Sequence, residues 1–115
     1  MSATYDDVCR LALAFPGVIE GHAYGGSSLH VGRKFLGRLR EDGETLVLKV
    51  DQAERENLLE EMPDAFFLTD HYQPHPLVLV NLLAVKMPVL ERLIEEAWRA
   101  LAPKRVLSGY EKSKP

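Results

Sequence analysis

The sequence predicts a single α+β domain, a two-layer sandwich in which one antiparallel sheet carries helices on one face. The 115 residues are 46% hydrophobic and 27% charged, which is ordinary for one globular domain with its own core. Hydrophobic residues recur with the period of a helix in some segments and with the period of a strand in others. The strand-like segments come in runs rather than alternating with helices, which favours an antiparallel sheet.

The first helix is predicted to begin after Thr4 and to run to about Phe15. Thr4 and Asp7 resemble a capping box, with aspartate in place of the usual glutamate. The pair Pro16–Gly17 ends the helix, because proline and glycine interrupt helical structure. Residues 18–28 are rich in glycine and have no hydrophobic period, so we expect a loop there.

Three strands are expected next, an antiparallel meander over residues 28–31, 35–40 and 46–50. The pair Gly32–Arg33 supplies the first turn, and residues 41–44 contain the Asp-Gly pair typical of hairpins. Because side chains alternate between the two faces of a strand, one set should face the helices. That set is Leu29, Val31, Phe35, Gly37, Leu39, Leu46, Leu48 and Val50.

A second helix and two further strands follow the meander. Asp51 and Glu54 make a second capping signature, which predicts a helix that ends at Pro63. Residues 65–69 and 77–83 fit two short strands joined by a loop.

The last predicted helix has the clearest amphipathic stripe in the chain. Pro103 ends this helix, and residues 104–115 are polar and basic, which indicates a flexible tail. The predicted order is therefore α-β-β-β-α-β-β-α in a single domain over residues 1–103. The stripe consists of Leu90, Leu93, Ile94, Ala97, Trp98 and Leu101.

The composition also indicates the cellular location and the kinds of partner that we expect. No apolar run approaches the roughly 18 residues that span a bilayer, and the N-terminus lacks the pattern of a secretory signal. The lack of such a run argues against a membrane partner. Cys9 is the only cysteine, which excludes an internal disulfide and favours a reducing, cytoplasmic location. The net charge of −3 argues against non-specific binding of nucleic acid by the molecule as a whole.

The sequence does not predict a catalytic or metal site. His71 and His75 have the i,i+4 spacing of a helical metal site, but Pro74 and Pro76 exclude a helix there. Residues 25–28, Gly-Gly-Ser-Ser, fit neither a nucleophile elbow nor a phosphate-binding loop. We therefore expect a protein that is not an enzyme and uses no cofactor or metal.

Several short motifs together resemble the MmcQ/YjbR family over nearly the whole chain. The resemblance implies the same order of elements, in a fold likened to type III secretion chaperones, and a DNA-binding function without catalytic residues. It makes the loop at residues 70–76 the link between the last two strands. Leu77 departs from the family, which usually has a tryptophan there. The motifs are Pro16-Gly17-Val18-x-Glu20, Tyr24-Gly25, Gly32-x-Lys34-Phe35 with Leu39, Val50-Asp51, Phe67-x-Thr69-x-His71-Tyr72, Val78-x-Val80-x-Leu82, Ala97-Trp98-Arg99 and Ala102-Pro103-Lys104.

The strand face opposite to the helices is predicted to be basic. Acidic residues are concentrated on the second helix instead, so a molecule of negative net charge can still present a local positive surface. Such a surface suits contacts with the phosphates of duplex DNA. The predicted contact residues are His30, Lys34, Arg38, Arg40 and Lys49.

Two alternative interpretations use other residues near the same face. Leu36, Val47, Leu77 and Leu79 would make it partly apolar, as in a chaperone-like domain that binds a protein partner or a second copy of itself. Tyr24, His71 and Tyr72 would form a small pocket. The first expectation for His71 and Tyr72 is structural, namely hydrogen bonds that fasten their loop to the sheet.

Overall fold

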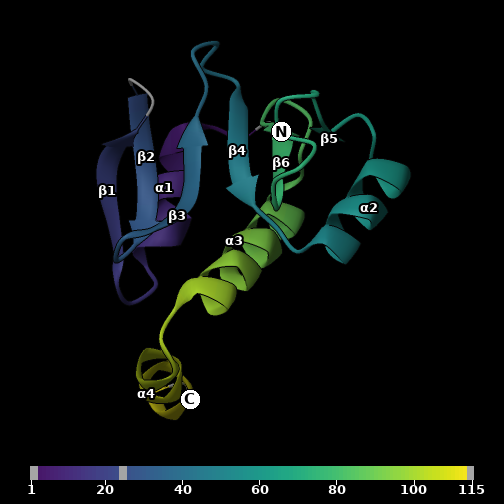
Figure 1. Ribbon diagram of the computed structural model, residues 1–115. Coiled ribbons are helices and arrows are strands. Elements are labelled where there is room, and N and C mark those ends of the chain that lie inside the picture. Colours follow the sequence, from purple (N-terminus) through teal and green to yellow (C-terminus); the bar gives the residue numbers. More distant parts are fainter. Residues whose placement is uncertain (1–2, 24–25, 114–115) are drawn as a thin grey trace.

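The computed structural model describes residues 3–23 and 26–113, and over these residues the chain forms one sheet with helices beside it (Figure 1). The fold class is the predicted one, an α+β arrangement with an antiparallel sheet. The elements are α1 (Tyr5–Leu13), β1 (Val18–Ala23), β2 (Gly26–Val31), β3 (Lys34–Leu39), β4 (Thr45–Lys49), α2 (Gln52–Glu61), β5 (Phe66–Phe67), β6 (Leu77–Asn81), α3 (Met87–Leu101) and α4 (Lys104–Ser113).

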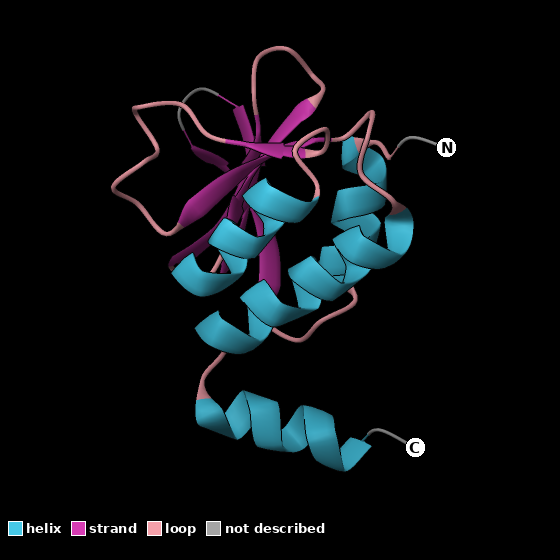
Figure 2. Cartoon of the chain, turned by 90° about the vertical axis from the view of Figure 1, so that its right-hand side faces the viewer, coloured by secondary structure: helices cyan, strands magenta, loops and turns pink. Residues whose placement is uncertain are grey.

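The strands lie in the order β1-β2-β3-β4-β6-β5, and each neighbouring pair is antiparallel. Figure 2 shows the helices gathered on one side of the strands. The main hydrophobic core lies between the sheet and this helical layer, and Val8 of α1, Leu90 of α3 and Leu46 and Leu48 of β4 belong to it. None of the described helices is long and apolar enough to cross a membrane.

The predicted starts of α1 and α2 are confirmed by their caps. The Thr4 hydroxyl accepts the Asp7 N–H at 3.2 Å, and the Asp7 carboxylate accepts the Thr4 N–H at 3.0 Å, which completes the capping box of α1. Asp51 caps α2 by accepting the N–H of Ala53 at 3.2 Å.

Residues 18–23, which we expected in a loop, form the edge strand β1. Val18 pairs with Val31, and the register continues along β2 to Ala23 and Gly26. The expectation was wrong because backbone hydrogen bonds to β2 hold this strand, and they need no hydrophobic alternation. Gly21 fits the strand, since a Cβ there would lie 3.4 Å from the His30 ring. The predicted three-stranded meander therefore has four strands.

A one-residue bulge in β3 changes which side chains face the helices. Gly37 lies opposite Leu29 and Phe35 lies opposite His30, so Leu36 is an extra residue on β3. Leu36 is consequently 1% exposed in the core against the helices, whereas Phe35 packs on the other face. Strict alternation had placed both residues on the wrong sides.

Residues 104–113, which we expected in a flexible tail, form helix α4. The Tyr110 ring packs on Trp98 and on Phe15, with ring centroids 4.9 and 5.7 Å away. The Arg99 guanidinium forms a salt bridge with Glu111 at 2.5 Å. The local composition is polar, so the prediction missed a helix that long-range contacts with Phe15 and with α3 stabilise.

Candidate functional site

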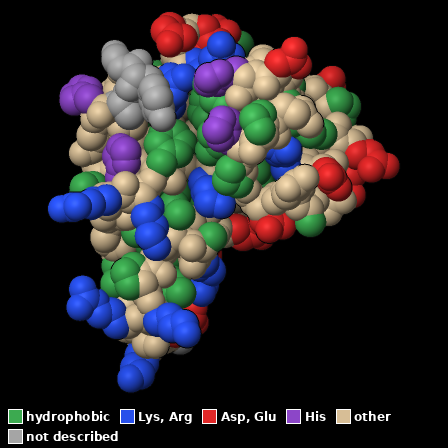
Figure 3. All heavy atoms as spheres, in the orientation of Figure 1, with side chains coloured by type: hydrophobic (Ala, Val, Ile, Leu, Met, Phe, Trp, Pro, Cys, Tyr) green, Lys and Arg blue, Asp and Glu red, His purple; other side chains and the backbone are tan. Residues whose placement is uncertain are grey.

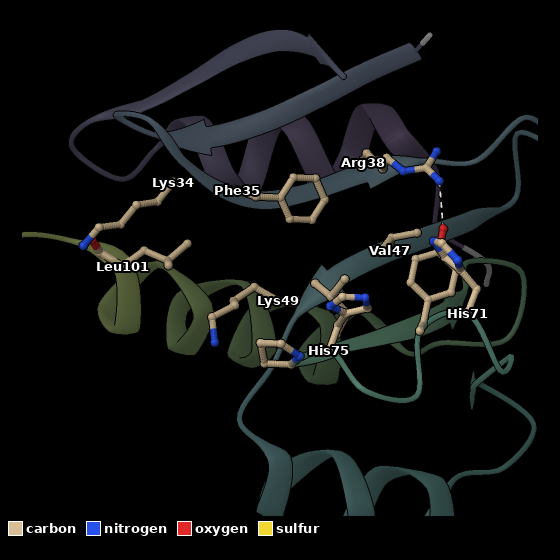
Figure 4. Close-up of a pocket in the computed structure, with 11 residues that line it drawn as sticks. Lys34, Phe35, Arg38, Val47, Lys49, His71, His75 and Leu101 are labelled. Atoms are coloured by element: carbon tan, nitrogen blue, oxygen red, sulfur yellow. Dashed lines mark hydrogen bonds between the residues drawn. The ribbon is translucent and has the colours of Figure 1, made fainter. Parts of the chain in front are cut away.

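A pocket of about 460 Å³ lies on the sheet face turned away from the main core (Figure 4). Strands β3 and β4 form one part of its lining, the loop before β6 forms another, and the end of α3 closes one end. The residues that line it are Lys34, Phe35, Arg38, Val47, Lys49, His71, Tyr72, His75, Pro76, Leu77 and Leu101.

The floor of the pocket belongs to a second, smaller hydrophobic cluster. Val47, Tyr72 and Leu79 are its buried members, at 1%, 8% and 0% exposure. Phe35 and Leu77 pack against them and are half-buried. The loop at residues 70–76 therefore covers part of a sheet face that we had expected to be open to solvent.

Successive hydrogen-bonded turns shape this loop. The N–H of Tyr72 donates to the Thr69 carbonyl at 3.0 Å, and the N–H of His75 donates to the Tyr72 carbonyl at 3.0 Å. The Pro76 carbonyl accepts the N–H of Val50, which ties the end of the loop to the end of β4. Pro74 lies in a turn and Pro76 in a bend, so these prolines are outside any helix, as the sequence predicted.

The Tyr72 side chain fastens the loop to the sheet, as predicted. Its hydroxyl accepts a hydrogen bond from the Arg38 guanidinium at 2.8 Å, and both residues are buried. His71 is exposed and contacts the Tyr72 ring edge-on, with ring centroids 4.9 Å apart. Figure 4 shows His71 and Arg38 beside each other at one end of the pocket.

Arg55 of α2 holds the other side of the loop, and sequence reasoning missed it. This residue is 5% exposed, and its Nη1 donates to the carbonyls of His75 and Leu77 at 2.6 and 3.1 Å. Its Nη2 donates to the Gln73 carbonyl at 3.1 Å. A signal was present, because position 55 lies on the same helical stripe as the buried Leu58.

The pocket is positively charged. Lys34, Arg38 and Lys49 line it, and no aspartate or glutamate does so among the residues that the structure describes. His71 and His75 add two imidazoles, with ring centroids 6.3 Å apart. Figure 3 shows basic and histidine side chains around hydrophobic ones on this face, whereas acidic side chains lie mainly toward its edges.

Of the predicted DNA contacts, Lys34, Arg38 and Lys49 come together in the pocket, and two do not line it. His30 is half-buried in β2, where its Nε2 lies 2.7 Å from the Ser28 hydroxyl. Arg40 lies just beyond β3 and is half-buried. Tyr24, predicted to join His71 and Tyr72, lies outside the described residues.

The predicted apolar interaction surface is not exposed. The bulge buries Leu36 on the helical side of the sheet, and the loop with Tyr72 buries Val47 and Leu79 on the other. Leu77 is half-buried and lines the pocket. These residues therefore supply hydrophobic packing and pocket lining rather than a contiguous apolar patch.

Across residues 3–23 and 26–113, no group of three or more histidine, cysteine, aspartate or glutamate residues could hold a metal ion. Cys9 is half-buried in α1, and burial raises the pKa of its thiol above the ordinary value. Burial also raises the pKa of the neighbouring Tyr5 hydroxyl. Both groups are thus less easily ionised than in water.

The family model YjbR matches residues 13–100 of the chain. The chain belongs to the YjbR family. It is 29% identical to Uncharacterized protein Mb2600 of Mycobacterium bovis, over 94% of this chain and 95% of that protein. Uncharacterized proteins MT2646 and Rv2570 of Mycobacterium tuberculosis match with the same identity and coverage.

A solved structure supports the fold of this YjbR domain. It is the crystal structure of Deinococcus radiodurans protein DR2400, a DUF419 domain, with a TM-score of 0.76. The match covers 90% of this chain and 82% of that one at 21% sequence identity, so it supports the fold alone. The predicted resemblance to the MmcQ/YjbR family is confirmed.

Proposed function

We propose that this YjbR domain is a non-catalytic binding protein that receives a small anionic molecule in the pocket on its sheet face. The observation that carries the proposal is the lining, in which Lys34, Arg38 and Lys49 surround apolar walls without a described carboxylate. Apolar walls lower the local dielectric and strengthen the field of such cations. A concave, mostly preformed site with a few polar groups is the usual form of a small-molecule site.

The hydrogen bonds that hold the loop support the same proposal. Arg55 and Tyr72 hold residues 70–76 through hydrogen bonds to α2 and to the sheet, so the pocket exists before a ligand arrives. A preformed site loses little conformational entropy on binding, which favours affinity.

Duplex DNA is the second candidate, because the basic surface continues from the pocket toward α4. Lys34 also lines a neighbouring hollow of about 330 Å³ with Arg33, and Pro103 and Val106 form its other side. Lys104 and Arg105 of α4 are exposed next to Pro103. A rigid duplex cannot enter the pocket itself, so its phosphates would meet only side chains at the rim and on α4. We therefore place DNA second.

The test is a set of thermal-shift and calorimetric titrations with small carboxylates and phosphates. A ligand at 100 times its Kd should stabilise the folded protein by about 2.7 kcal/mol. Arg38→Gln and Lys49→Gln should each weaken this effect. Lys86→Gln is the matched control, because Lys86 is exposed at the start of α3 and does not line the pocket. Equal binding by all three variants would refute the proposal.

A parallel titration with duplex DNA at two salt concentrations separates the two candidates. Phosphate contacts give a slope of log affinity against log salt of about −0.9 per contact. Tight duplex binding that Lys104→Gln and Arg105→Gln weaken, and that Lys49→Gln leaves unchanged, would favour DNA over the small anion.

A further inference from the structure

The pocket has two cationic ends with an apolar middle. Lys34 pairs with Val31 and Arg38 pairs with Ser28, which places the two cations three residues apart along β2. At about 3.3 Å per residue, their Cα positions lie roughly 10 Å apart along the sheet. Figure 4 shows Lys34 with Leu101 at one end, Arg38 with His71 at the other, and Phe35 and Val47 between them.

Lys49 belongs to the same end as Lys34. Val47 pairs with Arg38, and Lys49 lies two residues farther along β4, which runs antiparallel to β3. This direction leads away from Arg38 and toward Lys34. One end therefore holds two flexible ammonium groups, and the Lys34 ammonium donates to the Leu101 carbonyl at 3.4 Å.

The other end offers a planar group in a fixed position. The Arg38 guanidinium is oriented by its hydrogen bond to the Tyr72 hydroxyl, and the Arg38 residue is only 9% exposed. A planar guanidinium matches the geometry of a carboxylate, whereas a lysine ammonium acts as a point charge for carboxylate or phosphate alike.

The middle of the pocket suits a flat, apolar body. The half-buried Phe35 ring is packed edge-on by the His30 ring, with centroids 6.0 Å apart, which restricts its movement. Val47 and Leu77 supply aliphatic surface on the neighbouring strands. Aromatic rings gain from stacking on such a surface in addition to the area that they bury.

We infer that the ligand is an organic diacid with one acidic group at each end of a flat, apolar middle. The Arg38 end takes a carboxylate, and the Lys34 and Lys49 end takes the second acid, a carboxylate or a phosphate. This inference rests on the proposed function, since it names the class of anion that the same pocket would bind.

Calorimetric titrations of the full chain with matched acids test the inference. The probes are benzoate, terephthalate, biphenyl dicarboxylate, 4-carboxyphenyl phosphate and linear dicarboxylates of increasing length. We expect one diacid length to bind best, about tenfold more tightly than the monoacid, the gain expected from one more charge-assisted contact. A second acid that is a phosphate rather than a carboxylate should preserve this gain.

Variants locate the two ends. Lys49→Gln should abolish most of the advantage of the diacid over the monoacid and weaken monoacid binding only slightly, whereas Lys86→Gln should preserve the advantage. Arg38→Gln should weaken the binding of both the diacid and the monoacid. If Arg38→Gln does not fold, Tyr72→Phe replaces it, because that change removes the hydroxyl that orients the Arg38 guanidinium. Diacid and monoacid binding with equal affinity would overturn the inference while leaving the proposed function intact. Binding of no acid would overturn both.

Discussion

Replacing Arg55 with methionine should destabilise the protein by about 3 kcal/mol and loosen the wall of the pocket. The change removes a buried guanidinium that donates three hydrogen bonds, to the carbonyls of Gln73, His75 and Leu77. Methionine keeps much of the buried volume, so the loss reports mainly on these bonds.

The magnitude follows from opposing terms. Hydrogen bonds from a charged donor contribute about 1.5–3 kcal/mol each, which gives a gross value of roughly 5–9 kcal/mol for three. The variant no longer buries a charge, and the saved desolvation free energy offsets part of this loss. The saving is larger because, among the described residues, the buried Arg55 Nε has no hydrogen-bond partner. Water can reach part of the freed loop, because Gln73 and His75 are exposed. A net loss of about 3 kcal/mol results.

Urea denaturation gives the free energy of unfolding, and amide hydrogen exchange reports on the loop. The N–H groups of Tyr72 and His75 should exchange faster in the variant than in the wild type, while those of α3 should change only with global stability. Arg105→Met, on the exposed surface of α4, is the control. A loss below about 1 kcal/mol, with unchanged exchange in the loop, would contradict the assigned role of Arg55.

Three further predictions concern other parts of the molecule. Trp98→Ala should cost about 3–5 kcal/mol in thermal or urea unfolding, because the indole is fully buried, stacks on Phe15 and donates to the Pro16 carbonyl at 2.8 Å. Hydrogen bonds from the Glu44 N–H, and then from Thr45, lower the pKa of Asp42. The stability that the Asp42 carboxylate contributes to the folded protein is therefore complete above the ordinary carboxyl pKa and is lost as pH falls through the lowered pKa of the folded state. Asp42→Asn should therefore destabilise by up to about 1 kcal/mol at neutral pH, and its stability should converge with that of the wild type as pH falls below the lowered pKa of Asp42; a difference that stays constant between neutral and acidic pH would exclude the charge as the cause. The raised pKa of Cys9 leaves little thiolate near pH 7.5, so alkylation of native protein by iodoacetamide should be much slower than that of urea-unfolded protein, and equal rates would show that the thiol is not protected.

Local signals in the sequence predicted most of the fold. The side-chain oxygens of Thr4 and Asp51 act on N–H groups within three residues, so the helix starts are encoded nearby. Gly32 and Gly43 have positive φ, and they lie in the turns that the pairs Gly32–Arg33 and Asp42–Gly43 predicted. The stripe of α3 was also predicted, because it repeats every three to four residues and is buried.

The remaining features depend on contacts between distant residues. Strand β1 exists because β2 offers backbone partners, and α4 is held by Tyr110 on Trp98. For the site, alternation correctly placed Arg38 and Lys49 on one face, but it could not show that the loop closes over them. The helical stripe shared with Leu58 could have predicted the burial of Arg55, but its hydrogen-bond partners are carbonyls about twenty residues away in the chain, which no local pattern encodes.

Because of its bulge, β3 could be one residue shorter without a change in the sheet face that its other side chains occupy. Leu36 is the residue without a partner in the register, so a chain lacking it would still pair Phe35 with His30 and Gly37 with Leu29. Every other side chain would keep its face, and the loss would be a leucine from the core. We therefore expect YjbR domains to differ by one residue at this position, with a larger side chain elsewhere in the core wherever the residue is missing.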